Sequence, residues 1–295
     1  MIIEPQIKEQ VRRFYDQVGW REVGEGLYQN ARYEDLRPVA REYIHRCHLR
    51  VAHHLAPVGS YLLDAGSGPI QYPEYLAYSQ GYRYRVCADI SLVALLEARK
   101  RIGEHGLFVV ADIANLPFRA EAFDGAVSLH TIHHLPEGEH LNAYRELRRV
   151  LRPGRKAVVV NGWPSSRLMR LCEPLVWLSL RLRKAWGKIV RRRGARPALE
   201  PGNDTVGRDN GRQEGVHPKG TFTSRHGVSW VKQVVGSECS LEILVWRSVS
   251  VRFLRSLVHP WLGGRFWLRM LYRLEERFPR WFGENGQYPL IIIKK

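Results

Sequence analysis

Apolar and polar positions divide the chain into short, regular segments. Five apolar runs have the length of buried strands and are bounded by glycine, proline or acidic residues. They predict strands at about 61–65, 84–89, 107–111, 124–129 and 157–160. Between them, apolar residues recur at helical spacing, so helices are predicted to start near residue 72 and to span about 91–101 and 137–150. This alternation is typical of an α/β fold with helices on both faces of a mostly parallel sheet.

The first 57 residues have a different, helical pattern. Apolar residues recur at helical spacing over 11–18 and again over 43–55. The glycine-containing segment 24–28 between them is expected to be a loop. Pro57 and Gly59 then mark the entry into the sheet.

Two basic amphipathic stretches follow residue 163. A helix is expected to start at Pro174, with an apolar face made of Leu175, Leu178, Leu182, Trp186 and Ile189. Its opposite face carries Arg181, Lys184, Lys188 and Arg191. The second stretch, 261–280, sets an apolar stripe of Leu262, Phe266, Met270, Leu274 and Phe278 beside Arg265, Arg269, Arg273 and Arg277. A loop is expected at residues 194–220, and strands are expected at about 241–248 and 288–293.

The apolar faces of these stretches allow two interpretations. Amphipathic helices usually turn the apolar face to their own core, which leaves the cations solvated. Alternatively, they lie in the headgroup layer of a membrane, with cations against anionic lipid.

The clearest chemical pattern is a turn at the end of the first predicted strand. Asp64 closes this strand, and the run Gly66-Ser67-Gly68 follows. The glycines permit positive φ and let a ligand approach the backbone. Asp89 and Asp112 end the second and third predicted strands in the same way. Because the carboxyl ends of parallel strands meet at one edge of a sheet, the three carboxylates are expected to point into one crevice.

With these motifs the chain resembles the class I S-adenosylmethionine (SAM) dependent methyltransferases, in the broad group that includes quinone-biosynthesis methyltransferases. The resemblance covers about residues 58–162. It implies a Rossmann-like, doubly wound, mostly parallel sheet of seven strands with an antiparallel last strand. It also implies an N-terminal helical segment over the cofactor, a helical insertion after the fifth strand, and SAM as the cofactor.

The resemblance assigns a part of SAM to each motif. The glycine turn lies under the methionine part, Asp89 binds the ribose hydroxyls, and Asp112 with Ile113 holds the adenine. This fits hydrogen-bond chemistry, since a ribose diol can donate twice to one carboxylate and an adenine amino group to another. His130 corresponds to a position that touches the cofactor largely through its backbone. The complete implied set is Asp64, Gly66, Ser67, Gly68, Asp89, Ile90, Asp112, Ile113 and His130.

A nicotinamide-binding fold is the alternative for such a glycine turn. Its fingerprint requires another glycine where this chain has Gln71, and an acid just before the glycines is atypical for it. The further glycine that the methyltransferases often carry is replaced here by Ile70, so the turn is expected to be less open.

The expected chemistry is in-line transfer of a methyl group from SAM to a small, apolar or lipid-like acceptor. RNA methylation and a non-catalytic SAM-fold binding module are the alternatives. The expected domains are an N-terminal cap (1–57), a SAM-binding core (58–162), a basic insertion with a loop (163–227) and the C-terminal part of the sheet (228–295). In the resembled family the N-terminal segment helps to form the acceptor pocket, where Tyr15 and Trp20 would lie unless they are ordinary core.

No catalytic base is singled out by the sequence. An acceptor that must lose a proton needs a base, and the candidates are His130, His133, His134, His217 and His226. The run from His130 to His134 has no cysteine or acid at ligand spacing beside it, so no metal site is predicted.

Net charge adds a question about partners. A formal charge of +17 over 295 residues suggests a polyanionic partner, an acidic membrane or nucleic acid, although a basic surface without a partner is the alternative. Nucleic acid is the weaker of the two, because no RNA-binding module is recognisable. A cytoplasmic protein is expected, with peripheral attachment to a membrane as a further possibility. The expectation rests on four scattered cysteines, on the absence of a signal-peptide pattern and on the lack of an uncharged apolar run of ~20 residues. The oligomeric state and the methylated atom are left open.

Overall fold

The structure is a computed structural model that describes residues 4–24, 27–30, 34–192 and 221–295. For residue 4 and for 22–24, 27 and 185–192 it describes the backbone only. The predicted loop at 194–220 lies outside the described residues.

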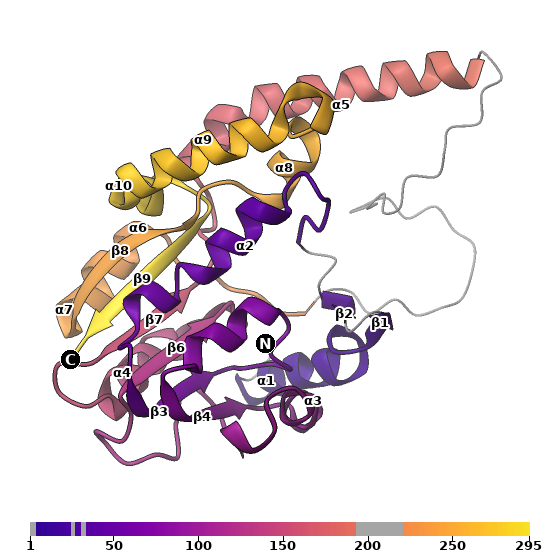
Figure 1. Ribbon diagram of the computed structural model, residues 1–295. Helices are drawn as coiled ribbons and strands as arrows, with labels where there is room; N and C mark the ends of the chain where they lie inside the picture. The colour runs from indigo at the N-terminus through magenta and orange to yellow at the C-terminus, as the bar shows by residue number, and fades with distance from the viewer. Residues whose placement is uncertain (1–3, 25–26, 31–33, 193–220) are drawn as a thin grey trace.

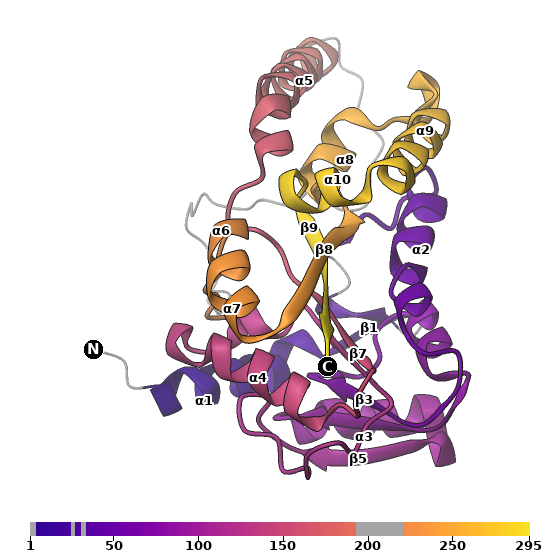
Figure 2. The same ribbon diagram turned by 90° about the vertical axis from the view of Figure 1, so that its left-hand side faces the viewer.

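Seven of the described strands form one sheet in the order β5-β4-β3-β6-β7-β9-β8 (Figures 1 and 2). Strand β9 runs antiparallel to both of its neighbours, and the other six strands share one direction. The bounds are β3 (Gly59–Ala65), β4 (Tyr82–Asp89), β5 (Gly106–Val110), β6 (Gly125–Leu129), β7 (Lys156–Val160), β8 (Ser240–Arg247) and β9 (Tyr288–Lys294). The chain order reverses between β3 and β6, and ligands of open α/β sheets bind at such a switch point.

The remaining elements are one small hairpin and a set of helices. The hairpin joins β1 (Glu22–Gly24) to β2 (Leu27–Tyr28). The helices, with 3₁₀ and π segments labelled η, are α1 (Glu4–Phe14), η1 (Tyr15–Gly19), α2 (Arg41–Leu49), η3 (Ala52–His54), η4 (Pro73–Ser79), α3 (Leu92–Ile102), η5 (Gly103–His105), η6 (Ile132–His134), η7 (Glu137–Glu139), α4 (His140–Val150), α5 (Arg167–Arg192), α6 (Val228–Trp230), η8 (Val231–Val235), α7 (Gly236–Glu238), α8 (Val251–Leu257), η9 (Pro260–Leu262), α9 (Gly264–Arg277) and α10 (Pro279–Asn285).

Both faces of the sheet are buried, as the continuous apolar runs predicted. Along β3, Leu63 packs on the face covered by α4 and η8, while Leu62 packs on the face covered by α3 and η4. The same alternation occurs in β7, where Val159 and Val158 lie in different clusters. The two-sided core therefore follows from the period of two along each strand.

A third cluster lies away from the sheet, between α2 and the helices α5, α8 and α9 (Figures 1 and 2). Buried Glu275 of α9 helps to join this layer to the core. Its carboxylate accepts hydrogen bonds from Tyr43 Oη (2.6 Å), Arg50 Nη1 (2.9 Å) and the backbone N–H of Ser248 (2.9 Å). These charge-assisted bonds fix α9 against α2 and the end of β8.

The sequence predicted the fold class and the strands, and the seven-stranded sheet with its antiparallel β9 confirms them. Ser91 caps the helix that was predicted at 91–101, since its Oγ accepts from the backbone N–H of Ala94 at 3.0 Å. The four domain boundaries stay a prediction.

Three local predictions were wrong. Residues 24, 27 and 28 of the expected loop lie in the paired strands β1 and β2, while residues 25 and 26 lie outside the described ranges, and α8 was not predicted. The helix expected to start at Pro174 starts at Arg167 and contains the proline. Ser166 explains the earlier start, because its Oγ accepts from the backbone N–H of Met169 (3.1 Å), which is a typical N-cap bond.

Candidate functional site

The glycine turn follows β3 directly and has left-handed backbone. Gly66 has φ of +75° and Gly68 has φ of +54°. A β-carbon added at Gly66 would lie 2.2 Å from Thr131 Cγ2, and one at Gly68 would lie 3.1 Å from the Trp20 ring. The turn is thus closely approached on both sides, which requires glycine at both positions.

Ile70 keeps this conformation where the resembled family often has glycine. Its φ is +55°, which is rare for a β-branched residue. The side chain is fully buried and packs with Val51, Tyr75 and Tyr78. Arg101 Nη1 donates to the Ile70 carbonyl at 2.8 Å. The turn therefore has the glycine-like backbone despite the substitution, and core packing holds the strained residue in place.

Asp89 at the end of β4 is bonded to the glycine turn. Its Oδ2 accepts from the backbone N–H of Gly68 at 2.9 Å, and its Oδ1 accepts from that of Ser91 at 2.8 Å. Burial raises the pKa of this carboxyl to about 6, against the lowering effect of the two backbone hydrogen bonds. An ionised carboxylate has about four acceptor sites. Two are therefore left for hydroxyl donors, which fits the predicted ribose role.

Asp64 differs from the expectation that its carboxylate points into the crevice. It is buried, and its Oδ2 accepts from Arg85 Nε (3.0 Å) and Nη2 (2.5 Å). Arg85 on β4 is itself fully buried, so this carboxylate oxygen neutralises an internal cation. The orientation was predicted wrongly because the partner, Arg85, lies on the neighbouring strand. A cofactor role for Asp64 stays a prediction.

Asp112, after β5, is held from two directions. Its Oδ1 accepts from the backbone N–H of Ala114 at 2.9 Å, and its Oδ2 is ion-paired with Lys8 of α1. Lys8 also pairs with Glu139, so it bridges two elements of the core. Ile113 is buried beside this site, and Ile90 is partly buried beside Asp89. The N-terminal helix thus reaches the acid that the resemblance assigns to adenine.

The segment after α1 covers the glycine turn. Trp20 stacks on Tyr15 with ring centroids 4.8 Å apart, and its ring lies against Gly68. Asp16 accepts a hydrogen bond from Ser91 Oγ, next to Asp89. Trp20 therefore lies against the glycine turn with Tyr15 stacked on it, and the place of both residues in an acceptor pocket stays a prediction. Lys8 and Asp16 were not predicted, since isolated charges in an amphipathic helix carry no distinctive signal.

His134 is bonded to this cover. Its Nδ1 is 2.8 Å from the carbonyl oxygen of Phe222, and its Nε2 is 2.8 Å from Tyr15 Oη. Because a carbonyl can only accept, we assign the proton to Nδ1, which leaves Nε2 as the acceptor. Burial lowers the pKa of His134 to about 4, with a smaller opposing effect from the Phe222 bond. The imidazole is therefore neutral at pH 7, with a basic nitrogen on the side of Tyr15.

An aromatic wall lies at the carboxyl end of β6 and β7. It consists of His130, Trp246 and Tyr288, whose ring centroids are 5.0 Å (His130–Trp246) and 5.8 Å (His130–Tyr288 and Trp246–Tyr288) apart. His130 has φ of +55°, and its backbone N–H donates to Val160 O at 2.7 Å. Burial and nearby Arg247 lower its pKa to about 3. The strand register places Arg247 opposite Tyr288, at this same edge.

Buried polar groups surround the wall. Arg247 is ion-paired with Glu34, and the ring of His48 stacks on Trp246 with centroids 5.4 Å apart. Within the described part of the chain, two buried donors here have no hydrogen-bond partner: Arg247 Nε and Trp246 Nε1. Buried donors without acceptors are rare in folded proteins. A signal for Arg247 was present in the sequence, as a cation at the end of an apolar strand.

The other candidate histidines are less informative. His133 Nδ1 lies 3.2 Å from Asn161 Oδ1, and His226 stacks on Trp230 with centroids 3.7 Å apart. His217 lies outside the described residues. Among the side chains that the structure describes, no group of three or more His, Cys, Asp or Glu residues could hold a metal ion.

Alanine at Gly66 tests the close approach in the turn. Gly154 has nearly the same φ, +73°, but a β-carbon there would meet no atom within 4 Å. Gly154→Ala is expected to lower the free energy of unfolding by about 1–2 kcal/mol through backbone strain. Gly66→Ala adds the clash with Thr131, so its free energy of unfolding should fall by at least about 1 kcal/mol more than that of Gly154→Ala. Urea unfolding of both variants measures the difference. Equal losses in both variants would show that the turn has room for a side chain.

Comparison with known proteins agrees with this geometry. Residues 63–159 match the family model of the methyltransferase domain. A tRNA (carboxymethyluridine(34)-5-O)-methyltransferase of Arabidopsis thaliana is 32% identical over 143 residues, which is 42% of this chain and 33% of the relative. Methyltransferase GfsG of Streptomyces halstedii is 31% identical over 108 residues, 35% of this chain and 38% of that protein. The matches therefore span little more than a third of either relative.

A solved structure extends the likeness to the whole chain. Phosphoethanolamine N-methyltransferase 1 of Haemonchus contortus, in complex with phosphoethanolamine and S-adenosylhomocysteine, superimposes with a TM-score of 0.56. The match covers 99% of this chain and 50% of that one, at 10% sequence identity. At this identity the likeness concerns the fold.

Proposed function

We propose that this chain, whose residues 63–159 belong to the methyltransferase domain family, transfers a methyl group from SAM to a small, apolar or lipid-like acceptor. The observation that carries the proposal is the junction of the glycine turn with Asp89. A partly buried carboxylate there is held by Gly68 N–H at 2.9 Å and keeps acceptor capacity for a diol. The match to the family model supports the same interpretation.

Each part of the site has a role in this proposal. SAM, when bound, supplies a methyl group already activated by a positive sulfur. Asp89 would accept hydrogen bonds from the two ribose hydroxyls, Asp112 and Ile113 would hold the adenine, and the backbone of the glycine turn and of His130 would line the methionine end. Tyr15 and Trp20 lie over the turn, and shielding from water there would strengthen the electrostatic interactions between the protein and the reacting groups.

His134 is the candidate general base. Its Nε2 is unprotonated at pH 7 and bonded to Tyr15 Oη, whose ring belongs to the cover over the glycine turn. A hydroxyl acceptor placed against this pair can pass its proton to the imidazole. A cleft of about 570 Å³ runs along α1 and ends at Thr221, next to Phe222, which holds the other nitrogen of His134. In this proposal the acceptor approaches His134 from the side of this cleft.

The aromatic wall supports an acceptor with a largely apolar body. His130, Trp246 and Tyr288 offer ring surfaces at the strand ends, and unpartnered donors nearby can bind one or two oxygen atoms. Pockets for small molecules commonly combine an apolar lining with a few directed polar groups. RNA is the second candidate, favoured by the net charge of +17 and by the tRNA methyltransferase among the relatives.

Transfer of a labelled methyl group tests the proposal. The chain is incubated with methyl-labelled SAM and a cell extract, which is then separated into organic-soluble, nucleic-acid and protein fractions. Label in the organic fraction is expected. Label in nucleic acid would establish the RNA alternative, and no transfer to any fraction would favour a SAM-binding module without catalysis.

SAM binding is expected to depend on pH through Asp89. Its pKa of about 6 lies above the ordinary value for Asp, so the free site is protonated below pH 6 and ionised above it. The ionised form accepts both hydroxyls, so the Kd for SAM should be nearly constant above pH 7 and about tenfold higher at pH 5. Calorimetric titrations at both pH values measure this. Asp89→Asn, which cannot titrate, should show no such change, and a wild-type Kd equal at both values would exclude the carboxylate from binding.

A further inference from the structure

Helix α5 exposes the described part of the predicted apolar face, which the core-packing interpretation would bury, and the side chains of Trp186 and Ile189 lie outside the described ones. Leu171, Leu175, Leu178 and Leu182 follow each other at helical spacing and are 49–75% exposed. The face that packs on α8 contains Val176 and Ser179, and Ser179 Oγ donates to Ser256 O at 2.6 Å. The core-packing interpretation of this stretch is therefore wrong for the described side chains.

The region from η9 to α10 also exposes large apolar side chains, most of them aromatic. The buried positions of α9 are Gly264, Leu268 and Glu275. The predicted apolar stripe faces outward instead, apart from the partly buried Met270. The exposed large side chains here are Trp261 (79%), Leu262, Phe266 (59%), Trp267 (62%), Leu274, Phe278 and Trp281.

These two regions lie at the same end of the molecule. Figures 1 and 2 both show α5, α8, α9 and α10 together above the sheet. We call the exposed apolar residues of α5, η9, α9 and α10 the outer apolar surface. A soluble monomer rarely exposes so many large apolar side chains in one region, and such a surface usually marks an interaction site.

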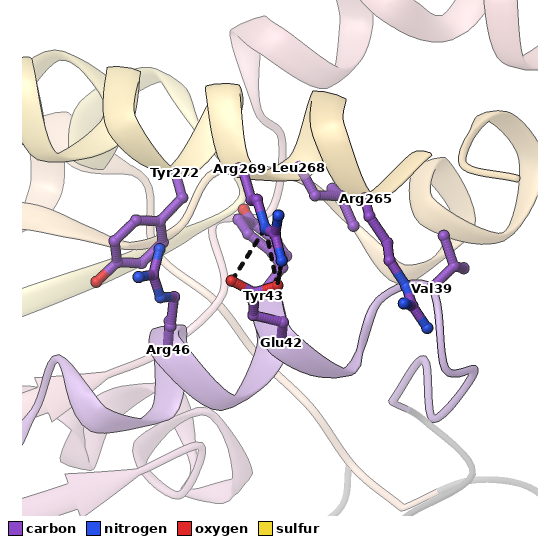
Figure 3. A pocket seen from close by; sticks show the side chains of 8 residues that line it. All are labelled: Val39, Glu42, Tyr43, Arg46, Arg265, Leu268, Arg269 and Tyr272. Atoms are coloured by element: carbon purple, nitrogen blue, oxygen red, sulfur yellow. Dashed lines mark hydrogen bonds and ion pairs between the residues drawn. The ribbon is translucent and has the colours of Figure 1, made fainter. Parts of the chain in front are cut away.

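Cations accompany the outer apolar surface. Arg181 lies over the Trp177 ring at 3.7 Å, and Arg265, Arg273 and Arg277 are exposed along α9. Figure 3 shows the groove between α2 and α9, which is lined by Arg46, Arg265 and Arg269, with Arg269 paired to Glu42. This combination of exposed tryptophan, leucine and phenylalanine with arginine is complementary to an anionic lipid surface, whose headgroups meet the cations while its acyl region takes the apolar side chains.

We propose that the outer apolar surface docks this protein on anionic membranes. A membrane fits better than RNA, because RNA would satisfy the arginines but would leave the leucine face of α5 in water. None of the helices within the described ranges is long and apolar enough to cross a bilayer, so docking is peripheral. The proposal does not depend on the methyl acceptor and goes beyond the proposed activity.

The surface is connected to the acceptor side of the site by hydrogen bonds. Arg37 Nη2 donates to the carbonyl oxygen of Leu254 in α8 at 2.9 Å, and Arg255 Nη2 donates to that of Glu34 at 3.0 Å. Glu34 is the ion-pair partner of Arg247 beside the aromatic wall. A docked membrane would thus lie against helices that directly contact the segment next to the acceptor site.

Vesicle flotation tests the proposal with the full chain. Vesicles of phosphatidylcholine and of equal parts phosphatidylcholine and phosphatidylglycerol are compared at low and high salt. Binding to the anionic vesicles is expected, with weakening as salt is added. Phe266→Ser/Trp267→Ser and Arg265→Glu/Arg273→Glu should each reduce the partition coefficient about tenfold or more. All four side chains are exposed, so thermal unfolding should be little changed.

Arg83→Glu/Arg119→Glu is the matched control. It makes the same change in charge at exposed positions, in β4 and in the segment before β6, and should retain flotation. An equal loss of flotation in the control and in Arg265→Glu/Arg273→Glu would show that binding depends on net charge alone, and would overturn the proposal. Three other results would also overturn it: no flotation at low salt, binding of total tRNA through Arg265 and Arg273 without vesicle binding, or dimerisation that Phe266→Ser/Trp267→Ser abolishes without vesicle binding.

Discussion

Replacing Asp89 by alanine is expected to weaken SAM binding roughly 30- to 150-fold, which corresponds to about 2–3 kcal/mol. The carboxylate is the predicted acceptor for both ribose hydroxyls, and its loss leaves them without a charged partner. It also frees the backbone N–H of Gly68 that now donates to Asp89 Oδ2 at 2.9 Å. Calorimetric titration with SAM measures the change, and thermal unfolding shows whether the variant is folded.

Glu104→Ala provides the control for this prediction. Glu104 is an exposed acid in η5, away from the glycine turn, and its removal should leave the Kd for SAM unchanged. A folded Asp89→Ala variant that binds SAM as tightly as the wild type would disprove the assignment of Asp89 to the ribose. The role that the resemblance implies for the acid at the end of the second strand would then be wrong.

Replacing His134 by alanine is expected to lower kcat by about 10²- to 10⁴-fold, the usual contribution of a general base. SAM affinity should change little, since the imidazole is hydrogen-bonded to Tyr15 and Phe222, which lie outside the predicted cofactor set. Tyr15→Phe removes the hydroxyl that bonds Nε2 and should have a smaller effect on kcat. The assay is methyl transfer at saturating SAM and acceptor.

The pH profile separates a base from a structural residue. The pKa of His134 is lowered to about 4, so its basic form is present above that value and is lost below it. At saturating SAM, wild-type kcat should be level from pH 8 to about 5 and fall as the pH approaches 4. The residual rate of His134→Ala should lack this decline. An unchanged kcat in the variant would exclude His134 as the base.

The fold was largely predictable from local pattern. Each strand of the sheet is a short apolar run with a period of two, and the buried alternation of Leu62 and Leu63 on opposite faces follows from that period. The turn after β3 was predictable too, because Gly66 and Gly68 are required where the backbone is left-handed and closely approached.

The residue types at the strand ends were predictable from their motifs, but the partner of each side chain was not. Asp89 was expected at a ligand, and it is joined to the glycine turn. Asp64 was expected in the crevice, but Arg85 on the next strand binds it, and strand register cannot be read from sequence. The same limit applies to Arg247 with Glu34, which are 213 positions apart in the chain.

The outer helices show a second limit. The spacing of apolar residues along a helix indicates that it has two unlike faces, but it does not indicate which face meets the core. In α9, buried Leu268 and Glu275 lie outside the most apolar stripe, and the stripe with Phe266 is exposed. Glu275 could be buried because Tyr43 of α2 and Arg50, which follows α2, satisfy its carboxylate, and these partners come from a distant part of the sequence.

Titration of the wild-type chain with SAM at pH 7.5 tests the central claim most directly, because every role assigned to the strand ends depends on that ligand. We predict saturable binding of one SAM per chain, competed by S-adenosylhomocysteine, and no heat with a nicotinamide dinucleotide. No binding of SAM by the folded chain, or saturable binding of the nicotinamide dinucleotide in its place, would contradict the account.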